Sequence, residues 1–238
     1  MKTYVYSTAI ETARALIERL LRLMDEDRTK VYYFAFSGGG TPSLMFDLWA
    51  NEYKDITPWE RMRVYWVDER CVPCDDSESN YGTMRRLLLD QVPIHKDYIF
   101  PIYGANPPEA EAKRYSETVC ATVPLWRNRP FFDAVMLGAG DDGHTSSIFP
   151  GQEHLLSSTE PYEVSRNPYN GQLRIAMTGN VLFNAKKLIF LVTGKSKVNV
   201  VHDITASGDT GPAAYVAHHA WNVEIFLDDL ADGRKILP

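Results

Sequence analysis

The sequence predicts one α/β domain, residues 1–238, in which a mainly parallel sheet is covered by helices on both faces. Two observations support this fold class. Short apolar runs alternate along the chain with segments of helical periodicity, which is the pattern of parallel strands joined by helical crossovers. A hydrophobic content of 45% over 238 residues also provides enough apolar material for one large core.

The first elements are a helix and a strand–turn–helix unit. Apolar residues recur at helical spacing after Ser7, which is a plausible helix cap; they are Ala13, Leu16, Ile17, Leu20, Leu21 and Met24. The run VYYFAF, residues 31–36, then predicts a strand. It stops at SGGGTP, and residues 43–49 continue with a helical pattern. We therefore expect a strand, a tight turn and a helix in this order.

Four further apolar runs predict the remaining strands of the sheet, at residues 64–67, 132–137, 188–192 and 223–227. Polar loops follow three of them, with the sequences VDER, GAGDDGHTSS and TGKSK. Ligands of parallel α/β sheets bind beyond the carboxyl ends of the strands. We therefore expect these three loops and SGGGTP to contribute to one site.

Composition and charge exclude several classes of protein. A formal net charge of -6 and an isoelectric point near 5.5 disfavour binding to nucleic acids. Three cysteines, Cys71, Cys74 and Cys120, are too few for a disulfide framework. There is no run of 18 apolar residues and no uninterrupted signal-peptide core, so no membrane segment is predicted. These features favour the cytoplasm.

The glycine-rich loop has the chemistry of an anion site. Its predicted binding residues are Ser37, Gly38, Gly39, Gly40 and Thr41. Glycines let the backbone approach an anion, and Pro42 fits the first turn of a helix whose free N–H groups point outward. No Gly-Lys-Ser/Thr follows, so a nucleoside triphosphate is not implied. A tight turn without a ligand is the alternative interpretation.

The segment Gly138–Gly143 matches the pattern G-x-G-x-x-G of dinucleotide-binding folds. We reject this interpretation, because Asp141 and Asp142 would lie where a pyrophosphate must bind. The sequence Phe-Pro-Gly at residues 149–151 also interrupts the long helix that the motif should open. No cofactor is predicted.

His144 is the candidate general base of this loop. An imidazole accepts a proton near neutral pH, and Asp142, two residues earlier, is placed to hold the other ring nitrogen. The alternative is a structural histidine at the end of a strand.

Two further loops carry candidate binding residues. Alternation along a strand sends Asp68 and Arg70 to one side and Glu69 to the other. Arg70 suits a phosphate or carboxylate, and Asp68 suits sugar hydroxyls, although a structural ion pair is equally compatible with this segment. Lys197 either binds phosphate or decorates a helix start.

Two other motifs are interpreted as structural or incidental. Cys71 and Cys74 form a C-x-x-C, but there is no second Cys pair or H-x3-5-H partner for zinc, and the acidic neighbours oppose redox chemistry. His218 and His219 are adjacent and diverge, so they are expected to be structural. No metal site is predicted.

The chain resembles the 6-phosphogluconolactonase family, within the wider group that includes glucosamine-6-phosphate deaminases. The resemblance runs from about Val31 to about Asp228 and rests on five segments in the family's order: FSGGGTP, VYWVDERCVPCDDSESNYG, FDAVMLGAGDDGHTSSIFPG, RIAMTGNVLFNAKKLIFLVTGKSK and GPAAYV. It implies a Rossmann-like open α/β sheet. It also implies a cofactor-independent hydrolase of the pentose phosphate pathway that converts 6-phospho-D-glucono-1,5-lactone to 6-phospho-D-gluconate.

The resemblance also assigns roles to residues of this chain. His144 matches the family's catalytic histidine and Asp142 its preceding acid, while Ser37 to Thr41 match the loop on the phosphate side. Arg70 matches the arginine of D-E-R and Lys197 the lysine of T-G-x-x-K. Arg174 matches a basic position near the substrate, with Arg166 as the alternative in a shifted loop.

Departures from the family pattern are small. Deaminase relatives read D-G-H-I-A-F-N-E-P and D-E-Y, whereas this chain reads DGHTSSIFP and DER, which favours the lactonase. The stretch GPAAYV lacks the usual Leu before Pro212, and we expect only a packing effect.

Three alternatives to the lactonase can be stated. A deaminase would use Asp68 to move a substrate proton and would release ammonia. A binding protein for sugar phosphates would keep the anion-binding residues without turnover, which intact His144 and Asp142 argue against. A nicotinamide-linked dehydrogenase would require the glycine match at 138–143 to be real. The oligomeric state and the donor to the oxyanion stay open.

Overall fold

The computed structural model describes residues 1–233. Its helices are α1 (Ala9–Asp25), α2 (Gly40–Glu52), α3 (Asn80–Leu87), α4 (Pro108–Thr122), α5 (Gly179–Leu182), α6 (Val198–Thr205), α7 (Pro212–His219) and α8 (Asp229–Asp232). Its strands are β1 (Lys2–Tyr6), β2 (Tyr32–Phe36), β3 (Met62–Trp66), β4 (Asp68–Arg70), β5 (Leu125–Trp126), β6 (Arg129–Pro130), β7 (Ala134–Leu137), β8 (Tyr162–Arg166), β9 (Leu173–Met177), β10 (Leu188–Val192) and β11 (Val223–Asp228).

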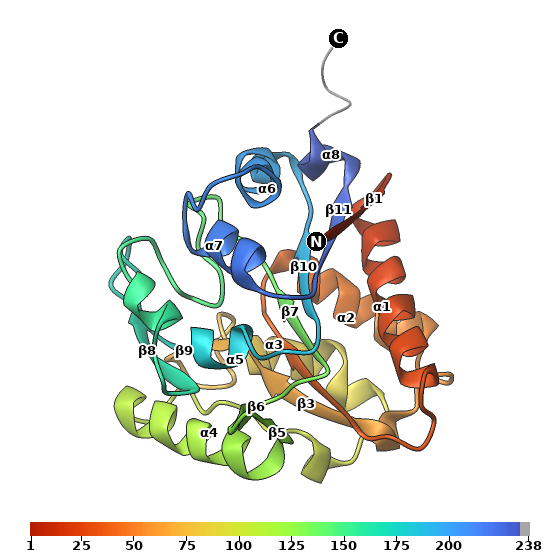
Figure 1. Ribbon diagram of the computed structural model, residues 1–238. Coiled ribbons are helices and arrows are strands. Elements are labelled where there is room, and N and C mark those ends of the chain that lie inside the picture. Colours follow the sequence, from red (N-terminus) through yellow and green to blue (C-terminus); the bar gives the residue numbers. More distant parts are fainter. Residues whose placement is uncertain (234–238) are drawn as a thin grey trace.

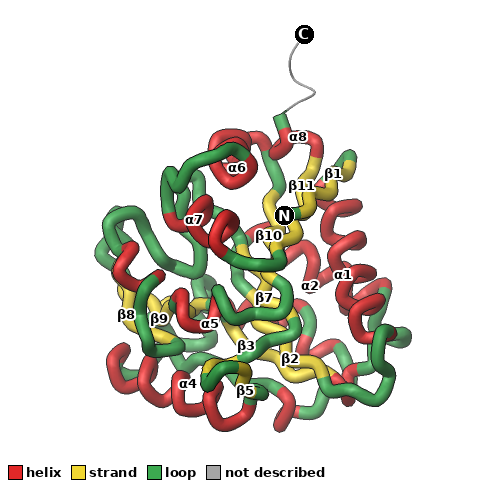
Figure 2. The backbone as a smooth tube through the Cα atoms, viewed as in Figure 1, coloured by secondary structure: helices red, strands yellow, loops and turns green. Residues whose placement is uncertain are grey.

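A six-stranded parallel sheet forms the centre of the fold, with strand order β1-β11-β10-β7-β2-β3. Helices α1 and α2 lie on one side of strands β10 and β11, and α6 and α7 lie on the other (Figures 1 and 2). The predicted mainly parallel sheet with helices on both faces is therefore confirmed. From β2 the chain moves outward to β3, and from β7 onward it moves the opposite way, so the order reverses between β2 and β7.

Two features of the sheet structure were not predicted. Strand β1 is an edge strand whose first two residues are exposed and whose last three are only partly buried, and its sequence KTYVY is too short to stand out as an apolar run. Strands β4, β9 and β8 form a separate antiparallel sheet. Strand β4 begins two residues after β3 ends, but it belongs to a different sheet. Asp68 and Arg70 therefore lie outside the central sheet. The strand predicted at 64–67 accordingly begins at Met62 and ends at Trp66.

Aromatic packing fixes α2 against the strand that precedes it. The ring of Phe36, the last residue of β2, makes edge contacts with Phe46 and Trp49 of α2, with centroid separations of 5.9 and 6.1 Å. All three side chains are almost fully buried. Aromatic pairs of this kind add about 0.5–1.5 kcal/mol each to the stability, beyond the effect of burying their apolar surface. The start of α2, and with it the glycine-rich loop, is therefore anchored by the core.

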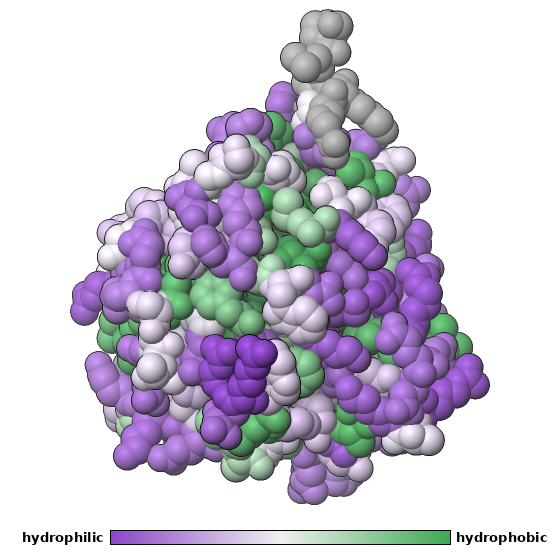
Figure 3. Space-filling model, viewed as in Figure 1, coloured by the Kyte–Doolittle hydropathy of each residue, from purple (hydrophilic) through white to green (hydrophobic). Residues whose placement is uncertain are grey.

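Figure 3 shows that polar residues cover most of the visible face of the molecule.

The first helix begins one residue later than the predicted cap. Thr8, not Ser7, is the N-cap, because its backbone is extended and its Oγ1 accepts a hydrogen bond from the Glu11 amide at 3.2 Å. Helix α2 likewise begins at Gly40 rather than at Ser43, inside the loop sequence itself.

This cap leads to a test with a matched control. Thr8→Ala should lower the free energy of unfolding by about 1 kcal/mol, because it removes an acceptor for one of the free amides of the first turn. Ser7→Ala should leave it unchanged. Urea unfolding followed by circular dichroism measures both variants, and equal effects would contradict the assignment of the cap.

None of the described helices is long and apolar enough to cross a membrane.

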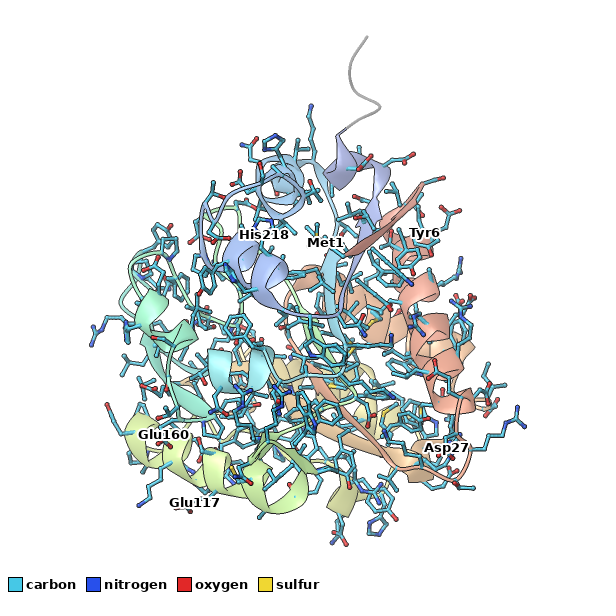
Figure 4. All side chains as sticks on the ribbon, in the orientation of Figure 1. Met1, Tyr6, Asp27, Glu117, Glu160 and His218 are labelled. Carbon is cyan, nitrogen blue, oxygen red and sulfur yellow. The ribbon has the colours of Figure 1, made fainter. Side chains whose placement is uncertain are left out.

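His218, on α7, is held between α6 and α7 (Figure 4), with Nδ1 3.0 Å from Asp209 Oδ1 and Nε2 3.0 Å from the Ile204 carbonyl oxygen. His219 also contacts Asp209, at 2.9 Å. Both histidines take part in local packing, as the sequence predicted.

Candidate active site

A cavity of about 400 Å³ lies at the carboxyl ends of β2 and β7, where the strand order reverses. Its wall includes most residues that the sequence singled out: Ser37, Gly38, Gly39, Asp68, Arg70, Asp142, His144, Arg174 and Lys197. Ligands of open α/β sheets bind at this position. The structure therefore brings four separate loops to one place.

The glycine-rich loop contributes only part of its predicted set to the wall. Gly38 and Gly39 line the cavity, whereas Gly40 and Thr41 do not. Gly40 is the first residue of α2, and Thr41 Oγ1 lies 2.8 Å from Thr193 Oγ1 after β10. The Thr41 hydroxyl thus connects the glycine-rich loop to the neighbouring strand end. The first turn of α2 still directs its amide groups toward this edge of the sheet.

His144 and Asp142 form a hydrogen-bonded pair in the loop after β7. Asp142 Oδ1 lies 2.6 Å from His144 Nδ1 and also accepts the His144 backbone amide at 3.2 Å. Burial alone would raise the pKa of the Asp142 carboxyl, but the charge of His144 and its backbone hydrogen bond outweigh this and lower the pKa. The carboxylate therefore stays ionised and leaves Nε2 as the free nitrogen of the ring.

The fold of this loop leaves no room for a side chain at Gly140. A Cβ there would lie 2.1 Å from His144 Nδ1 and 2.5 Å from Asp142 Oδ1. The Gly140 amide also donates to the His144 carbonyl oxygen at 2.8 Å, which closes the loop around the pair. The second glycine of the G-x-G pattern, Gly140, therefore makes room for the His144 ring and the Asp142 carboxylate. After this loop the chain continues into a short 3-10 helix, Glu153–Leu156, and then into β8.

Strand β4 separates its side chains as alternation predicted. Asp68 and Arg70 face the cavity, while Glu69 is 1% exposed and lies outside the cavity wall. Asp68 Oδ2 accepts a hydrogen bond from Ser147 Oγ at 2.6 Å. The Asp68 carboxylate is thus tied to the loop that carries His144.

Arg70 and Arg174 face each other across the β4–β9 ladder. The Nε atoms of both side chains are buried and have no hydrogen-bond partner among residues 1–233. Burial, followed by the charge of Arg70, lowers the pKa of Arg174 below its ordinary value. Arg174 belongs to β9 itself rather than to the loop before it, and the exposed Arg166 does not line the cavity. Two adjacent cations with unused donors favour an anionic ligand.

Lys197 lies in another part of the cavity wall, at the end of a short 3-10 helix, Lys195–Lys197. Its Nζ donates to the Ala139 carbonyl oxygen at 2.9 Å and lies 2.7 Å from Asp141 Oδ1. Lys197 is partly buried and its partner Asp141 is exposed to solvent, so the ion pair is weak and the ammonium group stays available to an anion.

The sequence analysis missed several residues of the wall. Ser146 and Ser147 follow His144, and Asn167 and Tyr169 come from the loop between β8 and β9. The hydroxyl of the exposed Tyr169 interacts with Asp142 and helps to lower its pKa. The polar run HTSS was a signal for the serines. Nothing local could place the β8–β9 loop at this site, since its position depends on the pairing of β9 with β4.

Cys71, the half-buried member of the cysteine pair, does not have the environment of a reactive thiol. Burial raises the pKa of the half-buried Cys71 thiol to about 11, and the charge of Glu69 adds to this effect. Such a thiol stays protonated at neutral pH and is a poor nucleophile and a poor metal ligand. Among residues 1–233 no group of three or more His, Cys, Asp or Glu side chains is arranged to hold a metal ion.

Comparisons with known proteins agree on one family. The family model described as glucosamine-6-phosphate isomerases/6-phosphogluconolactonase matches residues 7–225. A 6-phosphogluconolactonase of Treponema pallidum is 36% identical over 225 residues, covering 94% of this chain and 90% of that protein. Among solved structures, a protein named devB has a TM-score of 0.92 at 33% identity, covering 99% of both chains. The 6-phosphogluconolactonase of Trypanosoma brucei has a TM-score of 0.86 at 26% identity, covering 99% of this chain and 98% of its own.

Proposed function

The chain belongs to the glucosamine-6-phosphate isomerase/6-phosphogluconolactonase family, and we propose that it is a 6-phosphogluconolactonase, which hydrolyses 6-phospho-D-glucono-1,5-lactone to 6-phospho-D-gluconate in the oxidative branch of the pentose phosphate pathway. The observation that carries this proposal is the His144–Asp142 pair, which lies in one cavity with two cations that have unused donors. A base beside an anion site suits the addition of water to a phosphorylated ester.

We propose that His144 is the general base. Its free Nε2 removes a proton from water while the water oxygen attacks the ester carbonyl carbon, C1. Asp142, 2.6 Å from Nδ1, stabilises the imidazolium that forms. The tetrahedral intermediate then collapses with cleavage of the bond between C1 and the ring oxygen, and the imidazolium returns its proton to that oxygen. The products are a C5 hydroxyl and a C1 carboxylic acid, which ionises at neutral pH.

The same cavity supplies the groups that would hold the substrate. Arg70, Arg174 and Lys197 provide positive charge for the phosphate, and the amides of the glycine-rich loop add hydrogen bonds. Asp68 is placed to accept hydrogen bonds from sugar hydroxyls. Fixing the remote phosphate orients the ester toward His144, so that binding energy lowers the entropic barrier of the reaction. General-base assistance contributes about 100-fold to 10,000-fold.

The family name also covers an isomerase activity, and the cavity contains a carboxylate that such chemistry would need. Asp68 lies in the wall and would move the substrate proton in a deaminase. Its oxygen Oδ2 already accepts a hydrogen bond from Ser147 Oγ at 2.6 Å, whereas His144 Nε2 has no hydrogen-bond partner among residues 1–233. This difference favours the lactonase.

A paired assay decides between the two activities. Freshly prepared 6-phosphogluconolactone should disappear faster than its spontaneous hydrolysis when the protein is added, as measured by coupling the product to its dehydrogenase. Glucosamine-6-phosphate should release no ammonia in parallel. Release of ammonia without acceleration of lactone hydrolysis would overturn the proposal and move the catalytic role to Asp68.

A further inference from the structure

The start of α3 presses one side chain against the glycine-rich loop. Asn80, the first residue of α3, is 4% exposed and is not part of the cavity wall. Its amide group occupies the space beside Gly38: a Cβ at Gly38 would lie 1.9 Å from Asn80 Oδ1 and 2.3 Å from its Cγ. The backbone of the loop and the Asn80 amide are therefore in direct contact.

Asn80 also contacts the strand that carries the polar residues of the cavity. Its Nδ2 donates a hydrogen bond to the Asp68 carbonyl oxygen at 2.9 Å. One side chain outside the cavity wall thus touches the backbone of both the glycine-rich loop and β4. These two segments hold the proposed binding groups Gly38, Asp68 and Arg70.

The buried carboxylate of Glu69 fixes the position of Asn80. Its oxygens accept the backbone amides of Asn80 and Tyr81, both at 2.8 Å, and the hydroxyl of Ser79 at 3.0 Å. These bonds attach the first turn of α3 to the middle of β4 and replace the partners that a helix start lacks. Asn80 is therefore a rigid contact rather than a loose surface side chain.

We propose that Asn80 is a positioning residue, which sets the distance between the glycine-rich loop and the Asp68–Arg70 strand and so determines substrate affinity. This inference rests on the proposed function, because it assumes that the two segments bind the same phosphorylated substrate. Groups on separate segments bind one ligand well only when their spacing is held to a fraction of an ångström. The role passes through Gly38 and Asp68, and Asn80 itself touches no substrate.

The loop offers a direct test, since Asn80 alone excludes a side chain at position 38. The φ of Gly38 is not in the left-handed region, so alanine is compatible with the backbone there. The near atoms are the Asn80 side chain, and truncation to alanine leaves only its Cβ, 3.0 Å from the new methyl group. A few tenths of an ångström of movement then accommodates both.

The experiment measures KM and kcat for lactone hydrolysis in a double-mutant cycle. Asn80→Ala should raise KM about tenfold with kcat changed less than about threefold, because binding geometry and not the base is disturbed. Gly38→Ala should raise KM further, since its methyl group displaces the loop. The double variant Gly38→Ala/Asn80→Ala should return KM to about the value of Asn80→Ala alone.

Gly40→Ala is the matched comparison in the same loop. A Cβ at Gly40 meets no atom within 4 Å, so whatever this variant does to KM arises without Asn80. Adding Asn80→Ala to it should therefore give additive effects, in contrast to the rescue of Gly38→Ala. Additive effects in both backgrounds, or an unchanged KM for Asn80→Ala, would overturn the proposal.

A second measurement separates this inference from the proposed function. The melting temperatures of the same cycle report the Gly38–Asn80 contact without any substrate, and the calorimetric affinity for 6-phosphogluconate, the product, reports binding without turnover. A wild-type protein that neither accelerates lactone hydrolysis nor binds the product refutes the proposed function. A wild-type protein that does both, with Asn80→Ala equal to it in KM and product affinity, refutes only the role of Asn80.

Discussion

His144→Ala is expected to lower kcat for hydrolysis of 6-phosphogluconolactone by about 100-fold to 10,000-fold, the range of general-base assistance, while KM changes little. The reason is geometric. His144 Nδ1 is bound to Asp142, and Nε2 has no hydrogen-bond partner among residues 1–233, so the variant removes the nitrogen proposed as the base. The arginines, Lys197 and the glycine-rich loop, which are proposed to bind the substrate, stay in place. Initial rates are measured by coupled dehydrogenase assay, with the spontaneous rate subtracted.

Two companion variants sharpen this test. His95→Ala removes an exposed histidine that makes a tilted ring contact with Tyr98 and is not part of the cavity wall, so it should leave kcat unchanged. Asp142→Asn should lower kcat as well, because an amide cannot stabilise the imidazolium as a carboxylate does. A near-normal kcat for His144→Ala would refute its assignment as the base.

Arg174→Met should raise KM about 10-fold to 100-fold, the effect of losing a hydrogen bond of about 1.5–3 kcal/mol between charged groups. The same change should leave the protein at least as stable as the wild type. Arg174 is 8% exposed, its Nε has no partner, and burial and the charge of Arg70 lower its pKa. A methionine of similar length removes this unfavourable charge from the free protein.

A substitution that weakens substrate binding but does not lower stability identifies a binding residue, whereas loss of a structural residue lowers stability. Arg166→Met is the control, since Arg166 is exposed and lies outside the cavity wall; both KM and the urea midpoint should stay at wild-type values. If Arg174→Met destabilised the protein and left KM unchanged, Arg174 would be a structural residue and the phosphate would bind elsewhere in the cavity.

Local patterns predicted most of the central sheet, and they predicted that the loops of the candidate site would meet at one edge of it. The buried strands β2, β7, β10 and β11 are apolar runs, and polar or glycine-containing segments separate them. Such runs can be recognised without tertiary information. Strand β1 escaped detection because a partly buried edge strand needs no long apolar run. The cap of α1 was misplaced by one residue, since Ser7 and Thr8 both have the side-chain oxygen that a cap requires.

The His144–Asp142 geometry was also within reach of the sequence. Only Gly143 separates these two residues in the sequence, and Gly140 and Gly143 allow the loop to bring the side chains together. The Asp68, Glu69 and Arg70 alternation was readable for the same reason, because it depends only on the period of a strand.

The sequence by itself therefore determined the order of the five strands β2, β3, β7, β10 and β11 and the residue types at their carboxyl ends. Only the tertiary structure decided that β4 leaves the central sheet and pairs with β9, which brings Arg174 beside Arg70, and that Asn80 packs against Gly38. The physical reason is the range of the interactions. Side-chain periodicity and turn chemistry act over a few residues, whereas strand pairing and the packing of a helix start join segments whose proximity no local pattern encodes.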